Sequence, residues 1–389
     1  MKCRFLENLT LRSLLAPVGE EDFRDNYWEQ KPLVVHRGDP GYYGDLFTLQ
    51  DFDDAITRDP SYVKIANAAT NKAATHSGGT AAGLEGVLAD MREGDTLVLD
   101  QLHHRDPKLG ALCRLLGPEF GHRFQTNLYL TPPHGKGFTP HWDNHDVFIL
   151  QVLGSKHWKI EKERRAFPNT SNKMDNEGRE LRGECYAFTL KQGDLIYIPR
   201  GFVHAAECGA EPSLHITLGV TAVFLEDLLH AIIKAAVQRD DRLRVALPLG
   251  FMQRSQSELV NRAIEVLREV ADETFLNAVV DQFKDELVKS YPLDVSRQIL
   301  DFFQPNPLTV EDAVGPRRGI VYRVHNGDDS VRLNFGGRTI TFNSFFKEPL
   351  DFALNTPAYA IRDIAGDLED EEKVVFIERL MQEGLVIRK

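Results

Sequence analysis

The sequence is poor in the residues that build disulfide and zinc sites. It contains four cysteines, and no two of them form a Cys-x-x-Cys pair: Cys3, Cys113, Cys185 and Cys208. We therefore expect neither a disulfide framework nor a zinc knuckle, and a reducing compartment is favoured.

Long apolar runs and an excess of basic residues are also absent. Spanning a bilayer takes about 18 consecutive apolar residues, which no stretch provides, and Glu7 and Arg12 interrupt any apolar core of a signal peptide. The formal net charge is -12 at pH 7, whereas nucleic-acid binding draws on clustered Lys and Arg. We expect a cytoplasmic protein without membrane association or direct nucleic-acid binding, and a basic partner suits it better.

The chain is nevertheless large enough for several domains. It has 389 residues, of which 42% are hydrophobic, so a large core can form. Residues 1–85 mix short strands and helices. An alternating apolar pattern then predicts frequent strands, at 125–130, 147–152, 157–160, 195–198 and 214–220. Strands this frequent, punctuated by Gly-Asp and Pro-Gly, indicate a sandwich or barrel.

The pattern changes after residue 220. Apolar residues recur at spacings of three and four, which predicts amphipathic helices at 225–237, 259–270 and 275–283. Such faces dock either on their own chain or on a second copy.

The last 80 or so residues alternate strand-like pieces with helical ones and predict a small α+β module of the winged-helix kind. Its helical pieces lie at 349–354, 360–365 and 372–383. A winged helix usually binds DNA, but residues 311–389 carry 11 basic and 14 acidic side chains. A role in protein contact or packing is therefore favoured over recognition of bases in a DNA groove.

Two short motifs point to metal chemistry. His141 and Asp143 flank one residue, so on an extended strand both side chains project from one face. Taken alone, such a pair is usually a surface contact. The stretch from Gly193 to His204 adds a turn, a strand, a Pro-Gly corner and a second histidine. Two imidazoles and one carboxylate can hold one face of a ferrous ion and leave the other open for co-substrate and dioxygen, which predicts an oxygenase.

Further side chains can complete a pocket for the co-substrate. Lys156 follows a Gly-Ser turn between apolar residues and can meet the distal carboxylate of 2-oxoglutarate inside the barrel. Alternatively, it is a lysine at the end of a hairpin in solvent. Asn127 and Tyr129 share a strand face, and Thr217 lies on the strand after His204. These three either line the same pocket or form a polar strand face.

Two other histidines are weighed against these ligands. His145 is expected near the site or at the surface, because one strand cannot easily bring three successive same-face side chains onto one ion. His215 is expected on the strand face opposite Leu214, as a structural histidine with its hydrogen bonds satisfied.

At these residues the chain resembles the ribosomal oxygenases, JmjC-type, cupin-like hydroxylases that depend on Fe(II) and 2-oxoglutarate. The resemblance extends to the segment Tyr27-Trp28-Glu29-Gln30-Lys31-Pro32-Leu33. The motifs that carry it are Asn127-Leu128-Tyr129, His141-Trp142-Asp143, Phe148-Ile149-Leu150-Gln151 leading to Lys156 and Trp158, Pro199-Arg200-Gly201-Phe202-Val203-His204, and Ser213-Leu214-His215-Ile216-Thr217-Leu218.

The resemblance implies an α+β chain with four parts. Residues 1–85 are expected to form an N-terminal α/β extension of the barrel, and residues 86–224 the catalytic double-stranded β-helix, a JmjC or cupin jelly roll. Residues 225–308 are expected to form a helical dimerisation domain, which implies a homodimer, and residues 309–389 a winged-helix-like domain.

The resemblance also assigns roles within the site. His141, Asp143 and His204 are implied as the iron ligands, and Lys156 as the partner of 2-oxoglutarate, assisted by Asn127 and Tyr129; Thr217 is a further candidate contact. Trp142 stands where the histidyl hydroxylases of the family often have Tyr, and Gly219 where some members have Ser. These departures leave the identity of the substrate open.

The expected function is hydroxylation of a protein side chain by an Fe(II)- and 2-oxoglutarate-dependent dioxygenase that consumes dioxygen. A histidine or arginine of a ribosomal protein is the favoured target. Lysine demethylation and modification of a small ribosomally made peptide are alternatives. A different class, a metal-binding cupin with a regulatory role and no turnover, also remains open.

Overall fold

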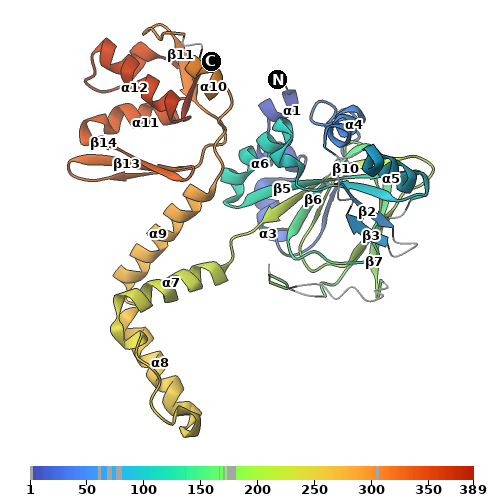
Figure 1. Cartoon of the computed structure of the whole chain (residues 1–389), viewed down its shortest axis with the longest axis horizontal. Coiled ribbons are helices and arrows are strands. Elements are labelled where there is room, and N and C mark those ends of the chain that lie inside the picture. Colours follow the sequence, from blue (N-terminus) through green and yellow to red (C-terminus); the bar gives the residue numbers. More distant parts are fainter. Residues whose placement is uncertain are drawn as a thin grey trace. The chain divides into compact units, whose positions relative to one another are not determined.

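The computed structural model describes residues 3–59, 63–67, 72–75, 81–135, 137–165, 167–169, 171–172, 181–303 and 306–389. The chain divides into two compact units, Met1–Ala222 and Val223–Lys389 (Figure 1). Strands from residues 1–85 pair in the same sheet as the later strands, so this segment is continuous with the barrel in its hydrogen bonding. The four-part division at residues 85, 224 and 308 stays a prediction.

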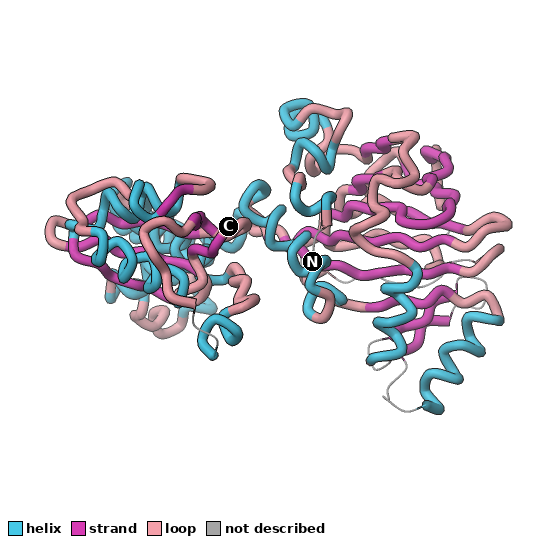
Figure 2. The backbone as a smooth tube through the Cα atoms, turned by 90° about the horizontal axis from the view of Figure 1, so that it is seen from above, coloured by secondary structure: helices cyan, strands magenta, loops and turns pink. Residues whose placement is uncertain are grey.

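The first unit is built around antiparallel strands that lie side by side in Figure 2. The main path runs β1-β8-β6-β10-β5-β4-β2-β3, while β7 and β9 pair with β6. This large antiparallel arrangement is that of the predicted jelly roll. The strands are β1 Leu33–Val35, β2 Val63–Asn67, β3 Lys72–Thr75, β4 Thr96–Leu99, β5 Arg123–Thr131, β6 Asp146–Glu161, β7 Cys185–Lys191, β8 Leu195–Ile198, β9 His204–Glu207 and β10 Ser213–Thr221.

One long strand, β6, replaces the two strands predicted at 147–152 and 157–160. Its first half pairs with β8 and β10, and its second half pairs with β7 and β9. The strand bends near Gly154, whose φ is +64° and where a Cβ atom would lie 1.9 Å from the carbonyl oxygen of Pro212. Only glycine fits there, so the residue that suggested a turn allows the strand to cross between sheets. The alternative of a hairpin-end lysine in solvent is wrong, because Lys156 is buried and lies inside the strand.

Alternate residues of β6 face two different cores. Phe148 and Leu150 belong to the large apolar cluster that also contains buried side chains of the N-terminal helices. Val147 and Ile149 pack instead with Trp158 in a smaller cluster between the two groups of strands. The helices of this unit are α1 Arg4–Glu7, α2 Leu11–Leu15, α3 Glu20–Asn26, α4 Leu49–Arg58, α5 Ala81–Arg92 and α6 Pro107–Phe120, with a 3-10 turn η2 at Leu102–His104.

The second unit begins with the helices that the sequence predicts. They are α7 Leu225–Arg239, α8 Gln256–Val270 and α9 Glu273–Ser290, followed by α10 Gln298–Phe303, with 3-10 turns η3 Asp241–Leu243 and η4 Phe251–Gln253. Side chains cap two of these helices, since Ser255 accepts from the N–H of Glu258 and Asp272 from that of Phe275. Helices α7 and α9 contact each other, and α8 extends away from them (Figure 1).

The last part of the chain is a small α+β module with its own apolar core. One sheet has the order β15-β11-β16 and another β12-β13-β14. The elements are β11 Ala313–Pro316, β12 Tyr322–Asn326, β13 Ser330–Phe335, β14 Arg338–Asn343, η5 Ser344–Phe346, α11 Lys347–Asn355, β15 Tyr359–Ala360, η6 Ile361–Asp363, α12 Asp370–Gln382 and β16 Val386–Arg388.

The helix predicted at 360–365 is wrong. The backbone N–H groups of Ile361 and Arg362 donate to the carbonyls of Asp312 and Val310, so they are used in long-range bonds. Only the 3-10 turn η6 forms there. Among the described residues of the whole chain, no helix is both long and apolar enough to cross a membrane.

A buried ion pair joins the two segments that carry the predicted metal ligands. Arg200 and Asp146 are 3% and 0% exposed, and the guanidinium Nη1 lies 2.9 Å from a carboxylate oxygen. The same nitrogen also bonds Glu29, and the hydroxyl of Tyr197 donates to Asp146 at 2.9 Å. Because Asp146 follows Asp143 and Arg200 precedes His204, this network holds the two segments in register.

Removal of this arginine should destabilise the first unit. We expect Arg200→Met to lower its free energy of unfolding by about 3–5 kcal/mol, because Asp146 would be left as an uncompensated buried charge. Urea denaturation followed by tryptophan fluorescence measures this, since all three tryptophans lie in the first unit: Trp28, Trp142 and Trp158.

The matched control is Arg24→Met. Arg24 is exposed and pairs with Glu20 at 3.5 Å, so its loss should cost less than about 1 kcal/mol. Equal effects of the two substitutions would show that the buried network has no special role.

Candidate metal centre

The three predicted ligands come together through pairing of the main chain. The N–H of His141 donates to the carbonyl of His204 at 3.1 Å, and the N–H of His204 donates back at 2.8 Å. The N–H of Gly201 donates to the carbonyl of Asp143 at 3.0 Å. The expected extended strand through 141–143 is not formed, since only His141 takes part in a β-bridge. Pairing with the His204 segment positions this motif instead.

The side chains of these residues converge on a small volume. One ligand atom from each of His141, Asp143 and His204 lies within 4.8 Å of the others. The Nε2 atom of His141 is 3.9 Å from Oδ1 of Asp143, and the Nε2 atom of His204 is 3.6 Å from Oδ2. The three side chains can therefore contact one ion together; their role as metal ligands stays a prediction.

Backbone carbonyls orient both imidazoles. Nδ1 of His141 lies 2.9 Å from the carbonyl of Thr139, and Nδ1 of His204 lies 3.0 Å from that of Phe202. A carbonyl only accepts, so each neutral ring carries its proton on Nδ1 and turns the Nε2 lone pair toward the site. Burial, followed by the neighbouring His141, lowers the pKa of His204 to about 4, which keeps that ring neutral.

The third side chain supplies a negative charge. Burial raises the pKa of the Asp143 carboxyl, but His141, His204 and His145 outweigh this effect and hold that pKa below its ordinary value. The donor set is thus two imidazoles and one carboxylate. This set suits Fe(II) and other first-row divalent ions and supplies only three ligands, so further positions are available.

A pocket opens beside these three residues and contains a buried lysine. Lys156 is 3% exposed, and its Nζ donates to Oγ1 of Thr131 at 2.9 Å. Burial lowers the pKa of its amine to about 8. Thr131 is the one hydrogen-bond partner of this amine among the described residues, although an ammonium has three N–H donors. An anionic ligand in the pocket would supply the missing acceptors.

Two other polar atoms in the pocket also lack partners. Nε1 of Trp158 and Nδ1 of His215 are buried and have no hydrogen bond within the described part of the chain. His215 faces away from Leu214 as expected and stacks on Tyr129, with ring centroids 4.8 Å apart. The expectation that its hydrogen bonds are satisfied is wrong. Buried groups of this kind call for a bound water or ligand.

The lining of the pocket matches the sequence prediction in part. Tyr129 and Thr217 line it, but Asn127 does not; its Oδ1 accepts from the N–H of Gln101 at 2.8 Å. The sequence analysis did not single out Thr131, the hydrogen-bond partner of Lys156. It lies two residues after Tyr129 and so shares the strand face of Asn127 and Tyr129. The full lining is Tyr129, Gly137, Phe138, His141, Asp143, Ile149, Lys156, Trp158, His204, Ala205, Ala206, His215 and Thr217.

The structure places the two residues that depart from the family pattern. Trp142 is buried and is not part of the lining. At Gly219 a Cβ atom would lie 2.8 Å from the ring of His145. The glycine therefore makes room for this imidazole, which lies outside the lining and contacts Asn144 through Nδ1.

A second group with metal-binding side chains lies in the other unit. Asp281, Asp285 and His325 also bring one ligand atom each within 4.8 Å. However, Arg323 pairs with both carboxylates. A guanidinium thus compensates this charge, and the group is an ion-pair network on α9 and β12.

Metal binding should depend on the triad and not on the histidine next to it. We expect His204→Ala to weaken Co(II) binding more than about 100-fold, beyond the usual effect of residues that only orient ligands. We expect His145→Ala to change it little. Isothermal titration calorimetry and the visible absorption of Co(II) measure both, and equal losses in the two variants would contradict the assignment.

Comparison with known proteins agrees with this description. The JmjC domain family matches residues 108–228. The chain is 33% identical over 311 residues to ribosomal oxygenase 1 of Gallus gallus, an alignment that covers 74% of this chain and 51% of that protein. It is 27% identical to ribosomal oxygenase 2 of Mus musculus, with 94% of this chain and 80% of that protein covered. A relative from Caenorhabditis briggsae, 29% identical over 71% of this chain and 39% of its own length, is named a bifunctional lysine-specific demethylase and histidyl-hydroxylase NO66.

The fold has solved counterparts as well. The structure of YcfD, a ribosomal oxygenase from Escherichia coli, in complex with cobalt and 2-oxoglutarate has a TM-score of 0.56 at 17% identity and covers 96% of this chain and 99% of that one. The chain spans about half the length of the first curated relatives that it matches. The chain thus contains a JmjC domain, is similar in sequence to the ribosomal oxygenases, and has the fold of YcfD.

Proposed function

We propose that the protein is an Fe(II)- and 2-oxoglutarate-dependent dioxygenase that hydroxylates a side chain of a protein substrate. The observation that carries this proposal is the combination of an incomplete metal triad with a buried lysine that has N–H groups to spare. The relatives named ribosomal oxygenases, and the cobalt and 2-oxoglutarate in the YcfD complex, support the same reading.

The residues of the site have distinct tasks in this reaction. His141, Asp143 and His204 hold the metal, and Lys156 pairs with the distal carboxylate of 2-oxoglutarate. An iron(II) ion held there would supply the activation of dioxygen, with 2-oxoglutarate as the reductant that is oxidised and decarboxylated to succinate and CO2. One oxygen atom of O2 enters succinate and the other becomes the hydroxyl group of the substrate, so the reaction is balanced.

The walls of the pocket bind and shield the co-substrate. The pocket has a volume of about 60 Å³, which is small for a ligand site. We propose that Lys156 turns from Thr131 toward the ligand and that the N–H groups of Trp158 and His215 donate to it. The apolar walls, including Phe138 and Ile149, keep bulk water from the reacting atoms.

We further propose that the substrate is a basic ribosomal protein, modified on a histidine or arginine. The names of the relatives point to ribosomal substrates and to histidyl hydroxylation, and a chain of net charge -12 attracts basic partners. The same negative charge disfavours direct nucleic-acid binding. From the unpaired cysteines and the lack of a long apolar run we propose a cytoplasmic enzyme.

Two alternatives differ from this proposal in their products. Demethylation of a methyl-lysine would use the same site and release formaldehyde. A regulatory cupin without turnover would need no cation in the pocket, and the burial of Lys156 therefore argues against it, because burying an amine without a function is costly.

The test combines product analysis with a variant of the triad. The purified chain is incubated with Fe(II), 2-oxoglutarate and ribosomal proteins, and succinate and protein masses are measured. We expect succinate and a one-oxygen mass increase on a histidine or arginine, both lost in His141→Ala. Formaldehyde would identify a demethylase, and metal binding without succinate formation for any substrate would favour the regulatory cupin.

The same assay across pH tests the role of the lysine. Because burial lowers the pKa of Lys156 to about 8, its amine is charged below this pH and neutral above it. We expect kcat/KM for 2-oxoglutarate to fall by up to tenfold per pH unit above about 8, since this ratio reports the free enzyme. In Lys156→Met, kcat/KM for 2-oxoglutarate should be low at every pH and should not fall further above about pH 8. If the variant kept the same fall, another titrating group would be responsible for it.

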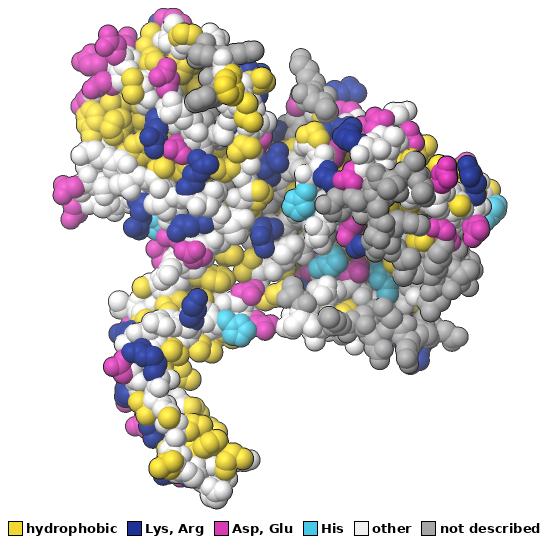
Figure 3. All heavy atoms as spheres, in the orientation of Figure 1, with side chains coloured by type: hydrophobic (Ala, Val, Ile, Leu, Met, Phe, Trp, Pro, Cys, Tyr) yellow, Lys and Arg dark blue, Asp and Glu magenta, His cyan; other side chains and the backbone are white. Residues whose placement is uncertain are grey.

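The helical part of the second unit carries exposed apolar side chains that we propose bind a second copy of the chain. Figure 3 shows hydrophobic side chains along α7 and α8. Exposed patches of this kind mark interaction surfaces. The exposed residues include Leu225, Leu229, Ile233, Leu247, Leu249, Met252, Val260, Ile264 and Leu267.

This proposal predicts a homodimer that a single charge disrupts. We expect the chain to have the mass of a dimer in light scattering and Ile233→Asp to have that of a monomer. The control is Val295→Asp, since Val295 is 56% exposed, close to the 51% of Ile233, but lies outside these helices. A monomeric wild-type chain, or a dimeric Ile233→Asp variant, would contradict the proposal.

A further inference from the structure

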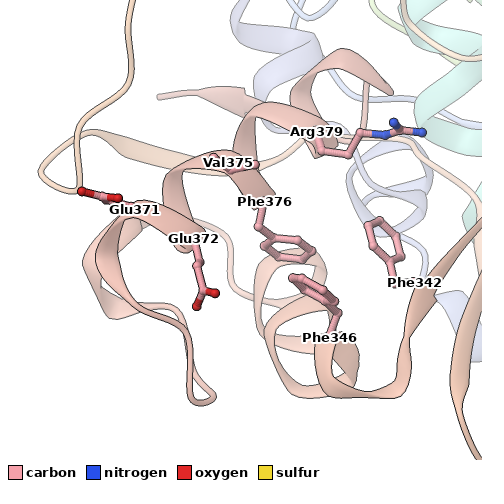
Figure 4. Close-up of a pocket in the computed structure, with 7 residues that line it drawn as sticks. All are labelled: Phe342, Phe346, Glu371, Glu372, Val375, Phe376 and Arg379. Carbon is pink, nitrogen blue, oxygen red and sulfur yellow. The ribbon is translucent and has the colours of Figure 1, made fainter.

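A groove in the C-terminal module is separate from the metal centre. It lies between α12 on one side and β14 with the 3-10 turn η5 on the other, and has a volume of about 460 Å³ (Figure 4). Its lining is largely apolar, with three charged side chains at its borders: Phe342, Phe346, Glu371, Glu372, Val375, Phe376 and Arg379.

Three phenylalanines form the apolar part of this groove. The rings of Phe346 and Phe376 stack at 5.3 Å, and the ring of Phe342 meets that of Phe376 edge-on at 5.8 Å. Val375, on the α12 wall, is 64% exposed. A pre-formed aromatic floor beside an exposed aliphatic side chain fits a large apolar side chain from another molecule.

The charge around the groove is negative. Five of the six residues from 367 to 372 are acidic, and Glu371 and Glu372 line the groove itself. Glu371 has no ion-pair partner among the described residues. At the other end, Arg379 pairs with Glu383 at 2.8 Å, so its positive charge is compensated. The groove thus offers uncompensated carboxylate next to an apolar floor.

We propose that this groove docks a basic polypeptide segment in which a large apolar side chain is flanked by lysine or arginine. The apolar side chain would fill the phenylalanine floor. The aliphatic stems of the flanking residues would pack beside Val375, and their cations would reach Glu371 and Glu372. Phosphate-rich partners are disfavoured by the same carboxylates.

The docking site does not depend on the proposed hydroxylase activity. All of its residues lie in the second unit, whereas the metal triad lies in the first. His141→Ala should therefore abolish hydroxylation and leave docking intact. The two proposals can fail separately.

The test measures binding of a defined peptide to the full-length chain. The probe is a fluorescein-labelled peptide with a central Leu-Phe pair flanked on each side by lysines. Its binding is measured by fluorescence anisotropy. We expect saturable binding that weakens with added salt. Glu371→Lys and Val375→Lys should each weaken it at least about tenfold, and a peptide with glutamate in place of lysine should not bind.

The matched control is Asp328→Lys. Asp328 is exposed in the turn between β12 and β13 and lies outside the lining, while its substitution changes the net charge as much as Glu371→Lys. The affinity of the Asp328→Lys variant for the peptide should stay within about twofold of that of the wild type. Circular dichroism of each variant checks folding; both groove residues are exposed.

Three results would overturn the proposal. They are equal effects of Glu371→Lys and Asp328→Lys, equal binding of the acidic peptide, and self-association of the chain that Val375→Lys abolishes. The last result would make a second copy of the chain the occupant of the groove.

Discussion

The buried ion pair between Arg200 and Asp146 is the constraint on which the candidate metal centre depends. It joins the segment that follows Asp143 to the segment that precedes His204. The main-chain hydrogen bonds between His141 and His204 form only if these segments keep their relative position. A buried pair of this kind contributes little net stability but is costly to break. Its value to the protein is therefore positional, because the ligand-bearing loops are otherwise irregular.

The interior of the barrel combines this rigidity with unsatisfied polarity. The outward face of the main sheet packs against the N-terminal helices with apolar side chains, which supplies ordinary hydrophobic stability. The interior side chains instead include His215 of β10 and Lys156 and Trp158 of the second half of β6, all buried with hydrogen-bonding capacity to spare. Burying polar groups without hydrogen-bond partners costs free energy, and proteins tolerate this cost mainly at sites that bind ligands. The outer side of the barrel thus supplies folding stability, and its interior supplies the polar groups available for binding.

The sequence was sufficient to predict the convergence of the three candidate ligands and most of the elements, but not every contact. The convergence of His141, Asp143 and His204 could be predicted because the spacing of the motifs and the strand patterns that flank them can be recognised from neighbouring residues in the sequence. The single strand β6 was not predictable, because the reason for glycine at position 154 is the carbonyl of Pro212, far away in the sequence. Asn127 is not part of the pocket lining, and its Oδ1 accepts from the N–H of Gln101, a contact that its strand face did not reveal; its role toward the co-substrate stays a prediction. The aromatic groove brings β14, η5 and α12 together, which periodicity alone does not reveal.

The continuity of β6 ties two parts of the site to one backbone. Ile149 and Lys156 both line the pocket beside the triad and lie on this strand on either side of the bend at Gly154. A strand shared by both groups of the barrel cannot be released from one without disturbing the other. Amide hydrogens of both halves should therefore exchange with solvent in a single cooperative opening, so that both contributions of β6 to the pocket are lost in the same thermal event.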